Sequence, residues 1–128
     1  MKTMYILAGL AVVVFGAGLL FMKTGSASSG LPGYASGNSL VKEAYLYATE
    51  KSEELNGVNC YCGCMQHQHG GRLHSRGLLD CFRTTSDGYD QHGSQCGMCI
   101  EDALTVKRMN LEGKTKSEAI DYIDSKYA

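Results

Sequence analysis

The stretch VNCYCGCMQHQHG, residues 58–70, places three cysteines at alternate positions and follows them with two histidines. Single residues, one of them a glycine, separate Cys60, Cys62 and Cys64. In an extended chain, residues two apart point to the same side, with α-carbons roughly 6.5 Å apart. The three thiols can therefore share one ion only if the chain curls, and Gly63 lowers the cost of that turn.

The segment around these cysteines lacks helical periodicity. Residues 58–93 contain all four histidines, are punctuated by glycine and asparagine, and carry apolar residues only in short patches such as GLLDCF. This pattern is typical of irregular structure organised by polar and sulfur side chains. We therefore expect a Cys/His-rich insert here.

Helical patterns lie on both sides of the insert. Apolar residues at helical spacing predict a helix over residues 39–56 and another over 94–113. A third is predicted over 115–127, where Thr115 stands three residues before Glu118, as in a capping box. The sequence thus predicts the all-α class, with about three helices around an irregular insert.

The amino-terminal end carries an uncharged apolar run, MYILAGLAVVVFGAGLLFM, over residues 4–22. A transmembrane helix needs about 20 such residues, whereas the apolar part of a signal peptide has roughly 7–15. We therefore predict a membrane anchor over residues 1–23, with a signal segment cleaved after Ala27 as the alternative. In both cases we expect the domain outside the cytoplasm, held by a single-pass anchor or secreted.

Two segments follow the predicted anchor. Residues 24–38 are rich in glycine and serine and contain the only proline, which predicts a flexible tether. Residues 39–128 are long enough for one small domain. Because Lys2 and Lys23 flank the anchor, acidic residues outnumber basic ones beyond it, and no basic patch suggests nucleic-acid binding.

A second cysteine motif, Cys96-Gly-Met-Cys99, lies at the start of a predicted helix, with Ser94 as a candidate N-cap. Residues three apart share a helix face, and the free amides of a first turn favour thiolate over thiol. Together with Cys81, the two motifs can present up to six soft ligands, which suit Cu(I) first and Zn(II) second. These are too many for one tetrahedral ion and favour two sites or a small thiolate-bridged cluster.

Histidine adds a second type of ligand. All four histidines fall within residues 67–92, although each could also be an ordinary loop side chain. His92 precedes the C-x-x-C motif by four residues and is the histidine we place in the predicted site. Asp80 could orient a ligand histidine or cap a turn.

Four segments resemble a bacterial envelope family named for its PCYCGC motif: NCYCGC, LLDCF, YDQHGSQCGMCIEDAL and LEGKTKSEAIDYID. The resemblance covers about residues 40–128 and depends on the order and spacing of the cysteines. It implies a secreted, often lipid-anchored protein with suspected metal binding. Asn59 stands where the motif has proline, and the predicted anchor lacks a lipidation cysteine. The metal-site positions carried over from the resemblance are Cys60, Cys62, Cys64, Cys81, His92, Cys96 and Cys99.

Three interpretations of the thiols remain open. Metal binding for handling or storage is the one we favour, because it accounts for the histidines as well as the cysteines. Structural disulfides are the first alternative, since an even number of cysteines is expected in a small extracytoplasmic domain. Thiol–disulfide exchange through Cys96 and Cys99 is the second alternative. No hydrolase or haem-attachment motif is present in the sequence, so we predict a non-catalytic binder of metal ions at the membrane.

Overall fold

A computed structural model describes residues 30–68 and 70–128 of the chain. In this part the protein is helical, and an isolated antiparallel bridge pairs Arg83 with Tyr89. The predicted all-α class is confirmed for these residues. The elements are η1 (Gly33–Ala35), α2 (Ser39–Glu50), α3 (Ser52–Leu55), η2 (Gly77–Cys81), α4 (His92–Gln95), α5 (Gly97–Leu111) and α6 (Lys116–Lys126).

The predicted membrane anchor, residues 1–23, lies outside the described residues. Within the described part, every helix is too short or too polar to cross a membrane. The carboxyl end of the predicted tether contacts the domain. Ala35 in η1 is fully buried, and the Tyr34 hydroxyl donates a hydrogen bond to the Tyr89 carbonyl at 3.3 Å.

The first predicted helix, residues 39–56, consists of two helices, α2 and α3. The side chain of Asn38 caps α2 by accepting a hydrogen bond from the amide of Leu40 at 2.8 Å. Lys51, at φ −131° and ψ 43°, leaves the helical region and separates α2 from α3. Gly57 ends the segment with φ +84°, the left-handed conformation that glycine adopts most easily.

The second predicted helix, residues 94–113, is also interrupted. Cys96, at φ −110° and ψ 100°, separates the short α4 from the long α5. The predicted N-cap role of Ser94 is wrong, because this residue lies inside α4 and its hydroxyl donates to the Gln91 carbonyl at 2.7 Å. The extended conformation of Cys96 makes this cysteine the residue that precedes α5.

The third predicted helix is α6, and its capping box is confirmed. The Thr115 hydroxyl accepts a hydrogen bond from the Glu118 amide at 3.2 Å. In return, the Glu118 carboxylate accepts one from the Thr115 amide at 2.8 Å. These two bonds satisfy amides that have no partner within the helix.

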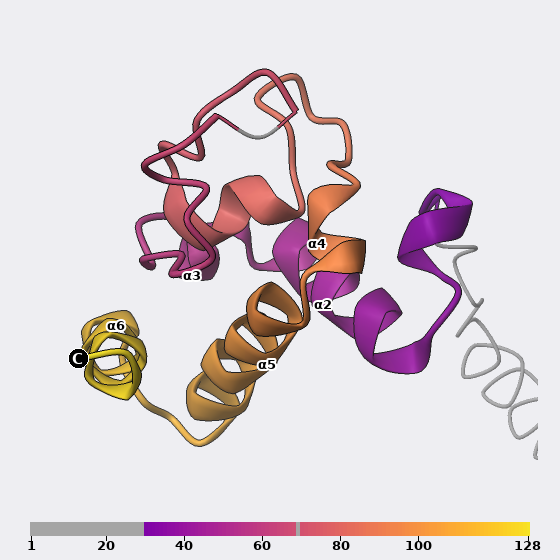
Figure 1. The fold of residues 1–128 in the computed structure, drawn as a ribbon. Helices are drawn as coiled ribbons and strands as arrows, with labels where there is room; N and C mark the ends of the chain where they lie inside the picture. Colours follow the sequence, from indigo (N-terminus) through magenta and orange to yellow (C-terminus); the bar gives the residue numbers. More distant parts are fainter. Residues whose placement is uncertain (1–29, 69) are drawn as a thin grey trace, which may run out of the picture.

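Helix α5 is the centre of the fold. It packs against α2 and α6, while the irregular insert lies over its amino-terminal end (Figure 1). Tyr45 of α2 reaches the insert, where its ring packs edge-on against Phe82 at a centroid distance of 5.1 Å. Val106 of α5 and Ile123 of α6 are almost completely buried in the same core. This shared core fixes the insert relative to the start of α5.

A close backbone contact holds the two halves of the insert together. The Val58 carbonyl accepts a hydrogen bond from the Leu78 amide at 2.8 Å. At the adjacent Gly77, with φ +66°, an added Cβ would lie 2.0 Å from the Val58 carbonyl oxygen. Only glycine fits at this position, because any side chain would collide with the Val58 carbonyl. The close contact brings the segment before Cys60 beside η2, which ends at Cys81.

Candidate metal centre

The loop that carries the first three cysteines is a tight turn. Residues 61–66 form turns, Gly63 has φ +91°, and its carbonyl accepts the amide of His67 at 3.0 Å. The curl predicted at Gly63 is therefore confirmed. The amide of Cys60 donates to the thioether sulfur of Met65 at 3.2 Å, which closes the loop.

Two other elements supply the remaining cysteines. Cys81 is the last residue of η2, and Cys99 lies in the first turn of α5, three residues after Cys96. Both Cys81 and Cys99 are fully buried. Thiols from three separate parts of the chain therefore meet between the loop, η2 and α5.

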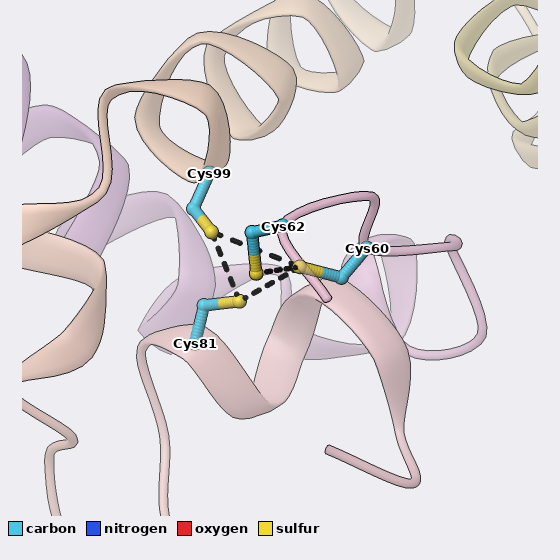
Figure 2. Close-up of side chains that lie close together, drawn as sticks. All are labelled: Cys60, Cys62, Cys81 and Cys99. Atoms are coloured by element: carbon cyan, nitrogen blue, oxygen red, sulfur yellow. Dashed lines mark hydrogen bonds between the residues drawn. The ribbon is translucent and has the colours of Figure 1, made fainter. Parts of the chain in front are cut away.

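Four of the sulfurs point toward one another (Figure 2). The sulfur of Cys60 lies 2.9 Å from that of Cys62, 3.3 Å from Cys81 and 3.7 Å from Cys99. The sulfurs of Cys81 and Cys99 are 3.2 Å apart. In a tetrahedral zinc site with Zn–S bonds of about 2.3 Å, sulfurs are about 3.8 Å apart. We call this set the inner group: Cys60, Cys62, Cys81 and Cys99.

A second set of ligand atoms overlaps the first. His92 Nε2 lies 3.5 Å from the sulfur of Cys62 and 3.8 Å from that of Cys99. The sulfur of Cys96 completes this set, in which every pair of ligand atoms lies within 4.8 Å. We call it the outer group: Cys62, His92, Cys96 and Cys99.

The six cysteines all lie in the described part of the chain, and each is a free thiol there. The shortest distance between two sulfurs, 2.9 Å for Cys60 and Cys62, exceeds the S–S bond length of about 2.05 Å. The sulfurs therefore form a cluster of thiols in which Cys60 has three neighbours.

The sixth cysteine and a second histidine border the two groups. The sulfur of Cys64 lies 3.4 Å from His92 Nε2 but belongs to neither group. His74 is fully buried, and its Nδ1 lies 3.5 Å from the sulfur of Cys81. The sequence contains no signal that His74 lies against Cys81, because the burial of His74 depends on how the insert folds back.

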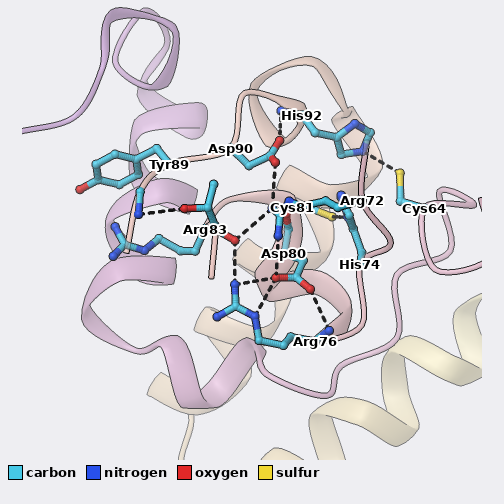
Figure 3. A network of polar contacts seen from close by, with 12 residues as sticks. Cys64, Arg72, His74, Arg76, Asp80, Cys81, Arg83, Tyr89, Asp90 and His92 are labelled. Atoms are coloured by element: carbon cyan, nitrogen blue, oxygen red, sulfur yellow. Dashed lines mark hydrogen bonds and ion pairs between the residues drawn. The ribbon is translucent and has the colours of Figure 1, made fainter. Parts of the chain in front are cut away.

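A network of charged side chains connects different parts of the insert next to the cysteines (Figure 3). Asp80, only 1% exposed, accepts hydrogen bonds from the Arg76 amide at 2.8 Å and from the guanidinium groups of Arg72 and Arg76. Asp90 accepts from Arg72 at 2.8 Å and from the backbone amide of His92 at 2.8 Å. Asp80 thus stabilises the turn before Cys81, and Asp90 fixes the backbone at a predicted ligand.

The contacts between the sulfurs shift the pKa values of the cysteines in opposite directions. Hydrogen bonds from the thiols of Cys81 and Cys99 lower the pKa of Cys60 to about 2. A hydrogen bond from Cys81 likewise lowers the pKa of Cys62 to about 5. Hydrogen bonding to Cys60 raises the pKa of both Cys81 and Cys99. At Cys99 the hydrogen bond with Cys60 therefore outweighs the preference for thiolate that the sequence predicted at the helix start.

The pKa of Cys64 is also raised, to about 12, but here the main cause is burial. Of the other candidates, His67 is exposed, and His69 lies outside the described residues. Met98, which precedes Cys99 in the sequence, is 37% exposed. The structure thus brings six of the predicted ligands into the two groups and leaves Cys64 at their edge.

The fold and this centre define a small all-α domain built around a cluster of cysteine and histidine side chains that could hold a metal ion. The model of a protein family described as "Protein of unknown function with PCYCGC motif" matches residues 17–128. The chain therefore belongs to the PCYCGC-motif family. Neither the curated proteins nor the solved structures gave a match.

Proposed function

We propose that this protein binds thiophilic metal ions outside the cytoplasm, for handling or storage, with Cu(I) as the preferred ion and Zn(II) as the second. The observation that carries the proposal is the inner group, in which four cysteine sulfurs from three segments lie within 4.8 Å of one another. Buried thiols gather in this way where a cation is to replace their protons, because thiolates alone would repel one another.

The chemistry of the donors supports a soft ion. Thiolate and thioether ligands favour Cu(I) and Zn(II) over hard cations such as Mg²⁺ or Ca²⁺. The thioether of Met65, which contacts the Cys60 amide, adds soft character beside the inner group. Sulfur outnumbers nitrogen among the converging ligands, which favours Cu(I).

Location and anchoring are part of the same proposal. The uncharged run over residues 4–22 supports a single-pass anchor that holds the domain on the extracytoplasmic side. Free thiols in an oxidising compartment are vulnerable to oxidation, and a bound ion would protect them.

The test is to purify the full chain anaerobically in detergent and to measure bound copper and zinc together with free thiols. We expect metal on the wild-type chain, and less metal than wild type on Cys62→Ser and on Cys96→Ser. His67→Ala, which removes an exposed loop histidine, is the matched control and should retain metal. A chain without metal whose cysteines resist alkylation after denaturation would instead establish the disulfide alternative.

Thiol–disulfide exchange is tested on the same preparation. If Cys96 and Cys99 form a reducible pair with exchange activity that survives Cys60→Ser, the protein is a redox protein and the metal proposal is wrong. We expect no such activity, because the sulfur of Cys99 is fully buried and already contacts the sulfurs of Cys60 and Cys81.

A further inference from the structure

The two groups of ligands have two members in common. Cys62 and Cys99 belong to both the inner and the outer group, whereas Cys60 and Cys81 belong only to the first. A thiolate has more than one lone pair and can bind two metal ions at once. Shared ligands allow six side chains to provide four donors to each of two ions.

We propose that the centre holds two ions together, bridged by the thiolates of Cys62 and Cys99, with an inner ion that is retained and an outer ion that exchanges. This inference rests on the proposed metal binding and adds the number of ions, their shared ligands and their different roles. The inner ion has Cys60 and Cys81 as its own ligands, and the outer ion has His92 and Cys96.

The distances fit this sharing. Cys99 lies 3.7 Å or less from both sulfurs that belong only to the inner group, and 3.8 Å from His92 Nε2 of the outer group. Cys62 lies 2.9 Å from the Cys60 sulfur and 3.5 Å from the same imidazole nitrogen. Both shared sulfurs therefore lie between ligands of the two groups, as bridging ligands must.

Charge also favours two ions over one. The two groups contain five cysteines and a single histidine. When all five are thiolates, one ion leaves most of their negative charge uncompensated in a largely buried site. A second cation neutralises part of the remaining negative charge.

Burial distinguishes the two positions. Of the ligands that belong only to the inner group, Cys60 is 3% exposed and Cys81 is fully buried. His92 and Cys96 are each half-buried, and the exposed Met98 lies two residues after Cys96 in the sequence. An incoming ligand can approach the outer position from solvent, whereas three of the four inner ligands are buried and only the shared Cys62 is half-buried.

The experiment uses the full chain, loaded anaerobically with ¹¹³Cd(II) as a spectroscopic probe for thiolate sites. We expect two ions per chain by native mass spectrometry and two cadmium resonances that are coupled to each other through the shared sulfurs. A chelator should remove the ions in two phases, with the outer ion lost first. Loading with Cu(I) and with Zn(II) should give the same count.

Single substitutions separate the positions. Cys81→Ser should lose the inner ion and keep one, while Cys96→Ser should lose the fast phase and keep one. Cys62→Ser and Cys99→Ser should abolish the coupling and weaken both positions. His67→Ala, which alters an exposed histidine outside both groups, is the matched control and should keep two coupled ions.

The outcomes that overturn this inference differ from those that overturn metal binding. One ion per chain, or two uncoupled ions of which Cys62→Ser removes only one, overturns the bridged centre but leaves the proposed function intact. Failure to bind any of the three metals overturns both. Circular dichroism identifies any variant that does not fold, and such a variant is left out. The coupling between the two cadmium resonances of the wild-type chain then decides whether the two ions share ligands.

Discussion

A single buried imidazole, His74, supports the sulfur centre from within the insert. Its Nδ1 lies 3.5 Å from the sulfur of Cys81, and its ring meets that of His92 edge-on at a centroid distance of 5.3 Å. If Cys81 binds a metal ion as proposed, its thiolate has no proton, and Nδ1 of His74 would donate the hydrogen bond between them. Burial is the main reason why the pKa of His74 is lowered, which favours the neutral ring. His74 is therefore a positioning residue for Cys81.

We predict that His74→Leu lowers the metal affinity of the full chain by about tenfold or more, as is usual when the hydrogen-bond partner of a ligand is removed. His74→Asn should recover most of the affinity, since its amide can donate from nearly the same place as Nδ1. Competition with a chelator measures the effect, and the exposed His67→Leu is the control. Equal losses in the Leu and Asn variants would show that His74 acts only by filling space.

Among the elements, α6 is joined to α5 by polar contacts at one end and begins with its own cap at the other. Asp102 of α5, 1% exposed, accepts hydrogen bonds from Lys126 at 2.9 Å and from the Tyr127 hydroxyl at 3.0 Å. At the amino end, the Glu118 carboxylate accepts the Thr115 amide. This backbone hydrogen bond is the main reason why the pKa of Glu118 is lowered. The cap of α6 thus depends on the ionised carboxylate of Glu118.

The lowered pKa of Glu118 predicts a specific pH dependence. A carboxyl whose pKa is lower in the folded state stabilises that state above its unfolded pKa, here 4.5, and loses this contribution as the pH falls through the folded pKa. The stability advantage of wild type over Glu118→Gln should therefore be present at neutral pH and shrink below pH 4.5. Urea unfolding of both metal-free chains across this range measures it; a constant difference would contradict the prediction.

For the molecule as a whole, the charged network and the sulfur centre form one unit that holds the insert against the helices. Arg72 donates to Asp80, to the Arg83 carbonyl and to Asp90, and so ties three parts of the insert together. Tyr45 of α2 extends this unit to the helices, because its hydroxyl donates to the Asp90 carbonyl and accepts the Ser94 amide. The position of His92 therefore depends on residues from the whole domain.

Asp80→Asn should accordingly destabilise the whole domain. It removes the buried carboxylate that pairs with the partly exposed guanidinium groups of Arg72 and Arg76, and the loss of a hydrogen bond to a charged group costs about 1.5–3 kcal/mol. Glu43→Gln, which breaks the more exposed pair with Lys107, should change the free energy of unfolding by about 0.5 kcal/mol or less.

Urea denaturation of the full chain measures both changes, and metal content should fall only in the Asp80 variant, because Asp80 holds the turn before Cys81. Equal effects of the two substitutions on unfolding would show that the network does not brace the insert.

Sequence patterns predicted the helical regions well and their interruptions poorly. The capping box at Thr115 depends on residues three apart, so it can be recognised locally. The breaks at Lys51 and Cys96 cannot, because the backbone leaves the helix there while the flanking residues keep their helical preference. The role of Asp80 in the turn was one of two predicted alternatives, and its arginine partners were not anticipated.

The amino-acid sequence alone determined the chemistry available to this protein: six thiols and four imidazoles, a glycine where the first motif must turn, and helices on either side. Only the tertiary structure decided that Cys62 and Cys99 lie between two groups of ligands, that Cys64 stands outside both, and that His74 supports Cys81. The physical reason is that helix caps and turns depend on residues a few positions apart. Distances between Cys60, Cys81 and Cys99, by contrast, depend on how the insert packs on α5.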